Sequence, residues 1–152
     1  MYILVIGGGK VGYQLVRALL IEGHEVLAIE RDPVRAASML EDLGNVILVG
    51  DGGEEGVLRE AGATRADVTI AATDSDEDNL VVCQIARHVF GVKRTIALVS
   101  DPRNEALFQK LGIDVTVSPS DMVLRNIEEE LPEQGLVHVM ALRSANRNVL
   151  EI

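Results

Sequence analysis

The chain has 152 residues, about the length of one domain and enough to bury a hydrophobic core. With 14 Lys and Arg against 24 Asp and Glu, its formal net charge is −10, which disfavours nucleic acid and anionic membranes as partners. Any phosphate binding must therefore come from a local arrangement of residues. The lone cysteine, Cys83, excludes an internal disulfide and indicates a reducing, cytoplasmic location.

Short apolar runs and helical patterns alternate through the first half of the chain. Residues 2–6 form an apolar run that ends in glycines, as expected of a buried central strand. Apolar residues then recur at helical spacing until Gly23, which predicts a helix. The expected elements are a strand over 2–6, a helix over 11–22, a strand over 25–30, a helix opened by Asp32 as N-cap and Pro33, a strand over 45–49 and a helix over 54–61.

The second half repeats this scheme. It predicts a strand over 68–72, a helix over 76–90, a strand over 94–99, a helix opened by Ser100, Asp101 and Pro102 that reaches 111, a strand over 114–117 and a helix over 118–131. Six strands separated by helices predict an α/β fold, a Rossmann-like, doubly wound, six-stranded parallel sheet with the order 3-2-1-4-5-6. We expect residues 1–131 to form this domain. Residues 132–152 are expected to form a linker and one strand that begins a truncated second domain, or else a dimer-forming arm.

Residues 7–12 match the pattern G-x-G-x-x-G, directly after a predicted strand and at the start of a predicted helix. In this motif Gly7 permits the sharp turn, Gly9 lets a pyrophosphate approach the main chain, and Gly12 lets the helix pack close to the strand. The N–H groups at the helix N-terminus then face the phosphates. The alternative is a glycine turn that binds no ligand.

Glu30 ends the second predicted strand, 18 residues after Gly12, close to the spacing of a ribose-binding acid. A carboxylate there accepts hydrogen bonds from both ribose hydroxyls and repels a 2′-phosphate, which favours NAD, ATP, ADP or AMP over NADP. The neighbouring Arg31 weakens this preference, because an arginine nearby can accept the extra phosphate. The alternative for Glu30 is a solvated charge at the end of a strand.

Further polar residues follow the predicted strands at the carboxyl edge, where such sheets bind ligands. Asp51 and Gly52 follow the third strand; Asp51 could accept a hydrogen bond from the adenine amino group or cap the next helix. Thr73 and Asp74 follow the fourth strand, across the switch point from the glycines. Lys10 could reach a terminal phosphate, or it is an exposed loop lysine.

The acidic run over residues 74–78 suggests either a metal site or a helix start in which Asp74 or Ser75 is the N-cap. We favour the helix start and expect no metal. Cys83 lies among apolar helical residues and is expected to be an inert buried thiol. No histidine has a partner at catalytic or metal spacing, so no catalytic residue is assigned.

The chain resembles the TrkA N-terminal domains, also called KTN or RCK domains, which are cytoplasmic regulators of Trk/Ktr potassium uptake systems and related potassium channels. The resemblance covers about residues 1–131. Its more specific parts are Gly50-Asp51 after the third strand and the segment 111–119, Leu-Gly-Ile-Asp-Val-Thr-Val-Ser-Pro. The other shared segments are the glycine motif, residues 29–32, residues 58–62 and residues 71–74.

The resemblance implies a sensor that is not an enzyme, binds NAD(H) or ATP/ADP, and forms a homo-oligomer, either a dimer or a higher ring. It also implies a potassium-translocating membrane subunit as partner, at the inner face of the cell membrane. The family often has Arg where this chain has Lys10, which keeps the charge but not the forked geometry. It also commonly has Ala-Arg in the fifth strand, where this chain has Ala97-Leu98 and so lacks the arginine for a basic contact. The cofactor-binding residues expected are Gly7, Gly8, Gly9, Lys10, Val11, Gly12, Glu30, Arg31, Asp51, Gly52, Thr73 and Asp74.

The last predicted helix carries an apolar stripe of Met122, Val123, Ile127 and Leu131, which favours oligomerisation. Two rival functions remain. One is the cofactor domain of an NAD-dependent oxidoreductase, which is disfavoured because no separate substrate domain follows. The other is a nucleotide-sensing repressor, which is disfavoured because no basic helix-turn-helix accompanies the charge of −10.

Overall fold

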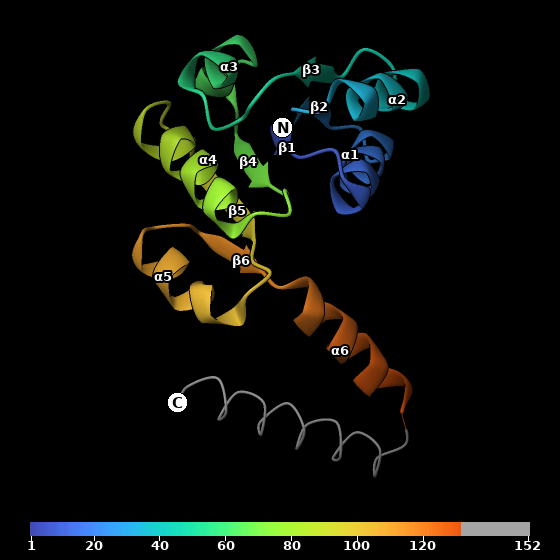
Figure 1. Cartoon of the computed structure of the whole chain (residues 1–152), viewed down its shortest axis with the longest axis vertical. Helices are drawn as coiled ribbons and strands as arrows, with labels where there is room; N and C mark the ends of the chain where they lie inside the picture. Colours follow the sequence, from blue (N-terminus) through green and yellow to red (C-terminus); the bar gives the residue numbers. More distant parts are fainter. Residues whose placement is uncertain (132–152) are drawn as a thin grey trace. The chain divides into compact units, whose positions relative to one another are not determined.

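The computed structural model of the chain describes residues 1–131. Residues 1–117 contain a six-stranded sheet in which all neighbouring strands are parallel, in the order β3-β2-β1-β4-β5-β6. This confirms the predicted fold class and strand order (Figure 1). The strands are β1 (Tyr2–Ile6), β2 (Glu25–Glu30), β3 (Ile47–Val49), β4 (Val68–Ala71), β5 (Arg94–Leu98) and β6 (Val115–Val117).

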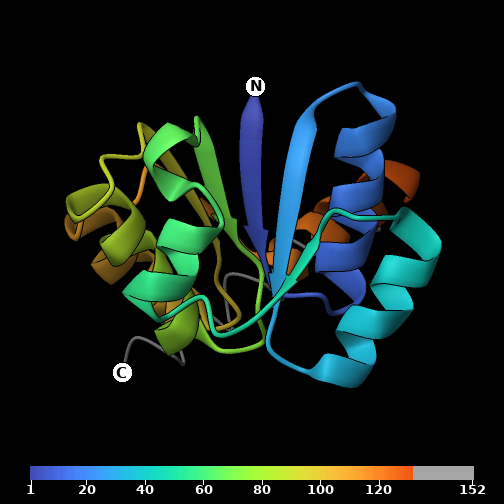
Figure 2. The same ribbon diagram turned by 90° about the horizontal axis from the view of Figure 1, so that it is seen from above.

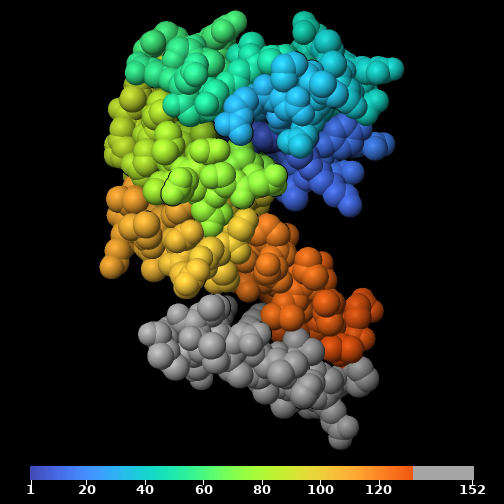
Figure 3. Space-filling view, viewed as in Figure 1, coloured from blue at the N-terminus to red at the C-terminus, as the bar shows by residue number. Residues whose placement is uncertain are grey.

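The central strand, β1, is buried on both faces of the sheet, as its uninterrupted apolar sequence requires. Its alternate side chains enter two different cores. Ile3 and Val5 belong to one cluster, and Tyr2, Leu4 and Ile6 belong to the other. In the space-filling view the first strand is almost completely covered by later segments of the chain (Figure 3).

Helices α1 (Lys10–Ile21) and α2 (Pro33–Leu43) cover one face of the sheet, where Val16 and Met39 pack against the cluster that contains Val5. The other face is covered by α3 (Glu55–Glu60), α4 (Asp76–His88) and α5 (Glu105–Lys110). Seen from above, the two groups of helices lie on opposite sides of the strands (Figure 2). Crossovers of this kind bring every strand-to-helix turn to the carboxyl edge of the sheet.

The predicted bounds of helices and strands agree with the structure to within two residues, except around residues 100–104. There the sequence predicts the first turn of an α-helix, but the structure has a short 3-10 helix, η2 (Pro102–Asn104), before α5. The cause is the main-chain bond from Asn104 N–H to the carbonyl of Asp101, which closes a turn one residue tighter than an α-helical turn. A second 3-10 helix, η1 (Ala63–Arg65), was not predicted.

The chain divides into two compact units, residues 1–117 and the residues from Ser118 onward. Of the second unit the structure describes α6 (Pro119–Glu130), whose N-cap Ser118 accepts a hydrogen bond from the Asp121 N–H. Apolar side chains on α6 are about half exposed, namely Met122, Val123 and Ile127. The strand expected within residues 133–152 lies outside the described residues. Among the helices of residues 1–131, none is long and apolar enough to cross a membrane.

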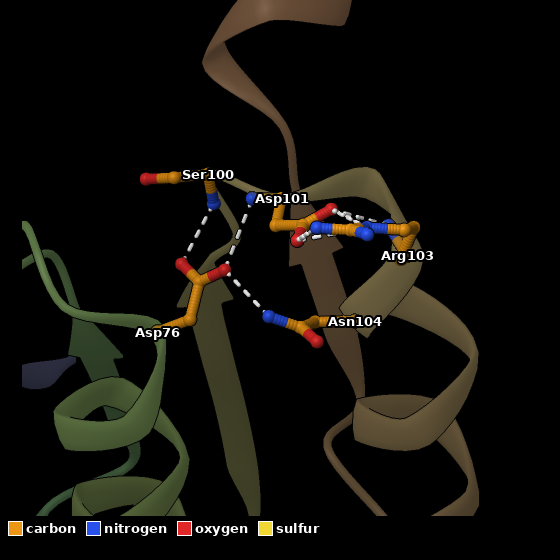
Figure 4. A network of polar contacts seen from close by, with 5 residues as sticks. All are labelled: Asp76, Ser100, Asp101, Arg103 and Asn104. Atoms are coloured by element: carbon orange, nitrogen blue, oxygen red, sulfur yellow. Dashed lines mark hydrogen bonds and ion pairs between the residues drawn. The ribbon is translucent and has the colours of Figure 1, made fainter. Parts of the chain in front are cut away.

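The start of α4 is tied to the loop after β5 by one carboxylate (Figure 4). Asp76 accepts hydrogen bonds from the Ser100 N–H at 2.7 Å, the Asp101 N–H at 3.0 Å and the Asn104 side-chain amide at 2.9 Å. Partial burial raises the pKa of Asp76, but these three bonds outweigh it and leave that pKa below its ordinary value. Asp101, in turn, pairs with Arg103 at 2.7 Å.

Replacing Asp76 with Asn should destabilise the fold by about 1 kcal/mol at neutral pH, because the variant presents an N–H₂ group to main-chain donors. The folded-state pKa of Asp76 is depressed, so its contribution is present above the ordinary pKa and is lost as the pH falls through the folded pKa. Urea unfolding of wild type and Asp76→Asn at several pH values should therefore show a difference in the free energy of unfolding that becomes smaller below about pH 4.

Glu77→Gln is the matched control, since Glu77 is an exposed acid in the same helical turn. It should change stability by less than about 0.5 kcal/mol at every pH. An Asp76→Asn variant as stable as wild type at pH 7 would show that the carboxylate does not hold the loop.

Candidate functional site

A hollow opens at the carboxyl edge of the sheet, between the turn after β1 and the turn after β4. This is the switch point of the strand order, where α/β sheets bind ligands. Eight of the sequence-predicted site residues line it: Gly7, Gly9, Glu30, Arg31, Asp51, Gly52, Thr73 and Asp74. It is also lined by residues that the sequence did not predict to bind the cofactor, among them Arg35, Gly50, Gly53, Ser75 and Asp78.

Four predicted site residues do not line this hollow. Gly8 and Lys10 line a second hollow on the other side of the glycine turn. Val11 is half exposed beside Lys10 on the outer surface of α1. Gly12 is buried beneath the turn. The structure thus spreads the motif residues around the turn instead of gathering them all in one cavity.

The glycine turn shows the geometry that its sequence predicts. Gly7 has a φ of +108°, a conformation that a residue with a side chain rarely adopts. A side chain at Gly12 would overlap the carbonyl oxygen of Gly7, so the close packing of α1 on the end of β1 requires glycine there. At Gly9, by contrast, the nearest atom to an added Cβ is a guanidinium nitrogen of Arg35 at 4.0 Å. Gly9 therefore opens onto free space.

The N-terminus of α1 supplies donors at this open position. Gly9 is the N-cap of α1 and has no capping side-chain bond, and the first turn contains no acidic residue. The amides of the first helical turn have no partner within the helix, and they carry the positive end of its dipole. An anionic group placed against Gly9 would meet these amides directly.

Glu30 is buried, with 5% of its surface exposed, and two main-chain amides satisfy its carboxylate. The Gly8 N–H donates to one oxygen, and the Asp32 N–H donates to the other at 2.9 Å. Of the two interpretations from sequence, the solvated strand-end charge is therefore wrong. Glu30 instead joins the end of β2 to the glycine turn while lining the hollow.

The turn after β3 forms another wall of the hollow. Asp51 accepts a hydrogen bond from the Gly53 N–H at 2.8 Å, and its carbonyl accepts one from Glu54. Since α3 begins at Glu55, the carboxylate of Asp51 stabilises the turn that precedes this helix. The alternative interpretation from sequence, in which Asp51 caps the helix, is therefore wrong. Its second carboxylate oxygen has no hydrogen bond to the part of the chain that the structure describes.

The turn after β4 is held by Asn79, a fully buried residue of α4. Its side-chain oxygen accepts from the main-chain amide of Thr73 at 3.0 Å and from the Thr73 hydroxyl at 2.6 Å. Its amide group donates to the carbonyls of Thr73 and Leu98. Ser75 is the N-cap of α4, as one of the sequence alternatives predicted. Asn79 thus fixes Thr73 at the edge of the hollow.

The net charge of the residues around the hollow does not favour an anion. Four carboxylates line it, those of Glu30, Asp51, Asp74 and Asp78, against two guanidinium groups, those of Arg31 and Arg35. Anion binding would therefore depend on where the donors lie and not on the overall field. Within residues 1–131, no three His, Cys, Asp or Glu side chains are grouped so that they could hold a metal ion.

Cys83 has the surroundings that its helical pattern predicts. The pKa of its thiol is raised to about 12, mainly by burial, so very little thiolate is present at neutral pH. The thiol is 1% exposed. It is an inert part of the core on the α4 side of the sheet.

The chain is similar to proteins named as components of potassium uptake systems. A Trk system potassium uptake protein TrkA from Mycobacterium tuberculosis is 37% identical over 155 residues, an alignment that covers 100% of this chain and 69% of that protein. Its name describes a component of a potassium uptake system.

Several solved structures share the fold at more than 25% identity. The NAD(P)-binding domain of an exopolyphosphatase-related protein from Archaeoglobus fulgidus has a TM-score of 0.75 at 27% identity, covering 84% of this chain and 95% of that one. GsuK bound to ADP has a TM-score of 0.68 at 26% identity, covering 80% of this chain and 31% of that one.

The family comparison covers the whole sheet described above. The model of the TrkA-N domain matches residues 3–119, from β1 to the beginning of α6. The resemblance seen in the glycine motif, the Gly50-Asp51 turn and the segment 111–119 is thereby confirmed. The chain belongs to the TrkA-N domain family.

Proposed function

We propose that the hollow binds an adenine nucleotide, either NAD(H) or ATP/ADP. The observation that carries this proposal is the open Gly9 at the N-terminus of α1, which lines the same hollow as the buried carboxylate of Glu30. A diphosphate at Gly9 would accept hydrogen bonds from the first-turn amides, and the neighbouring ribose would donate its hydroxyls to Glu30. Structural neighbours of this chain include a NAD(P)-binding domain and a protein bound to ADP, which supports the assignment.

The remaining wall residues are assigned by their position. Asp51, whose second carboxylate oxygen is available, would accept a hydrogen bond from the adenine amino group. Thr73 and Asp74 would lie on the side of the phosphates, across the switch point from the glycines. Lys10 would reach a terminal phosphate from the second hollow. Gly7, Gly8, Gly12 and Gly52 would act through the main chain, and Arg31 borders the site, whereas Val11 lines neither the main nor the second hollow.

The biological function proposed is that of a nucleotide-sensing regulatory subunit of a potassium transporter or channel, without catalytic activity of its own. The potassium uptake protein to which the chain is 37% identical supports this assignment. The partner would be a potassium-translocating membrane subunit, and the protein would act in the cytoplasm at the inner face of the membrane. The exposed apolar residues of α6 fit a homo-oligomer, a dimer or a higher ring.

Residues 1–131 would form the nucleotide-binding domain, and residues 132–152 would begin the segment that follows it. Exchange of one nucleotide for another would change the hinge between neighbouring domains, because phosphate groups of different number and position engage the glycine turn and Lys10 differently. A regulatory switch of this kind needs unequal affinities for the two ligands.

Calorimetry with NAD, NADH, ATP and ADP tests this function. We expect saturable binding at one site per chain, with affinities that differ by at least about tenfold between the tightest and the weakest of the four. Equal affinities for all four would remove the switching role. Steady oxidation of NADH with a small carbonyl substrate would instead favour the oxidoreductase.

Two glycine variants separate binding from folding. Gly9→Val should weaken nucleotide binding at least about 100-fold, because its methyl groups occupy the space assigned to the phosphates, while stability changes by about 1 kcal/mol or less. Gly12→Ala should lower stability by about 1–3 kcal/mol, because its Cβ overlaps the Gly7 carbonyl and α1 must shift. Titration calorimetry and urea unfolding measure the two effects. An unchanged dissociation constant for Gly9→Val would place the ligand elsewhere.

A further inference from the structure

Arg35 lies in the first turn of α2, beside the glycine turn and not in it. Its side chain is 48% exposed, and its guanidinium lies 3.8 Å from the Glu30 carboxylate, which is an ion-pair distance but too long for a hydrogen bond. Both oxygens of Glu30 already accept main-chain hydrogen bonds, from Gly8 and Asp32. Among residues 1–131, the guanidinium of Arg35 has no hydrogen-bond partner. Its donors are therefore available to a ligand.

The position of Arg35 relative to Gly9 is the second observation. Apart from Gly9 and its chain neighbours, a guanidinium nitrogen of Arg35 is the one atom of residues 1–131 that lies within 4.0 Å of the Cβ position at Gly9. Arg35 and Gly9 also line both hollows, the main one with Glu30 and the second one with Lys10. A ligand that extends from Glu30 past Gly9 toward Lys10 would run alongside Arg35.

Acidic side chains outnumber basic ones around the main hollow, so an anion there gains from a guanidinium placed at Gly9. Four carboxylates line this hollow, and Lys10 does not line it. Arg31 does line it, but Arg31 follows β2 directly, and no atom of it lies within 4 Å of the Cβ position at Gly9. A guanidinium can give two parallel hydrogen bonds to one phosphate, a geometry that a lysine ammonium lacks.

We propose that Arg35 is a specificity-determining residue that binds the phosphate chain of the nucleotide at Gly9. On binding, its guanidinium exchanges the long ion pair with Glu30 for hydrogen bonds to phosphate oxygens, while the Glu30 carboxylate, still held by the Gly8 and Asp32 amides, accepts the ribose hydroxyls. The preference for nucleotides over nucleosides then depends on a residue of α2 as well as on the amides of α1. This inference rests on the proposed nucleotide site and names one of its recognition groups.

The test compares adenosine, AMP and ADP as ligands of the full 152-residue chain. In Arg35→Ala we expect ADP to bind about 10- to 100-fold more weakly, while the dissociation constant of adenosine changes by about twofold or less. Arg35→Lys should recover part of the loss, because it keeps the charge but not the forked geometry. Arg17→Ala, which removes an exposed arginine from α1 outside both hollows, is the matched control for net charge and should leave all three affinities unchanged.

The binding measurements distinguish a failure of the role of Arg35 from a failure of the nucleotide site. If Arg35→Ala weakens adenosine and ADP by the same factor, Arg35 acts only by holding Glu30, and the proposal is wrong. It is also wrong if wild type binds ADP and Arg35→Ala binds it equally well, although the nucleotide site itself then stands. A wild-type chain that binds neither adenosine nor ADP overturns the site and the role of Arg35 together. Thermal unfolding followed by circular dichroism confirms that each variant is folded.

Discussion

The hydrogen bond from the Gly8 amide to the buried carboxylate of Glu30 connects the two parts of the molecule on which the site depends. One part is the turn that leaves β1, and the other is the end of β2. Without this bond, a carboxylate that is 5% exposed would lose a main-chain donor, and the glycine turn would keep only the Gly7 N–H bond to the Ile29 carbonyl as its link to the neighbouring strand. The same carboxylate faces the hollow, so the group that shapes the turn is also the group assigned to the ribose.

On the opposite side of the hollow, polar side chains of α4 hold the loops in a comparable way. Asn79 ties the turn after β4 to the end of β5, and Asp76 ties the start of α4 to the loop beyond it. Both residues belong to the first turn of α4. The edge that would face the phosphates is thus continuous with the β5–η2 loop, and a ligand that moved the start of α4 would also act on that loop.

Much of the fold could be predicted because parallel strands and their crossover helices leave a strong pattern. The apolar run of β1, the glycine that ends it and the Asp32-Pro33 helix start each have one simple physical interpretation, and the structure confirms them. The roles of Gly7 and Gly12 in the turn were also predictable, since they follow from main-chain geometry alone.

The side chains that complete the site were harder to predict, because their positions depend on how helices pack. Arg35 precedes the buried Ala36, so only the orientation of α2 brings its guanidinium to Gly9. Asn79 did leave a signal. It stands three, four and seven residues before Val82, Cys83 and Ala86, which places a polar residue on the buried face of α4. The burial of Glu30 could not be read from its place at the end of a strand.

A crystal structure of the chain with saturating ADP or NADH would show where the nucleotide binds. We expect density for a diphosphate against the main-chain amides at the start of α1, with the ribose hydroxyls on the Glu30 carboxylate. A structure in which the nucleotide binds away from Gly9 and Glu30, or in which the hollow stays empty at saturation, would contradict the proposed nucleotide site.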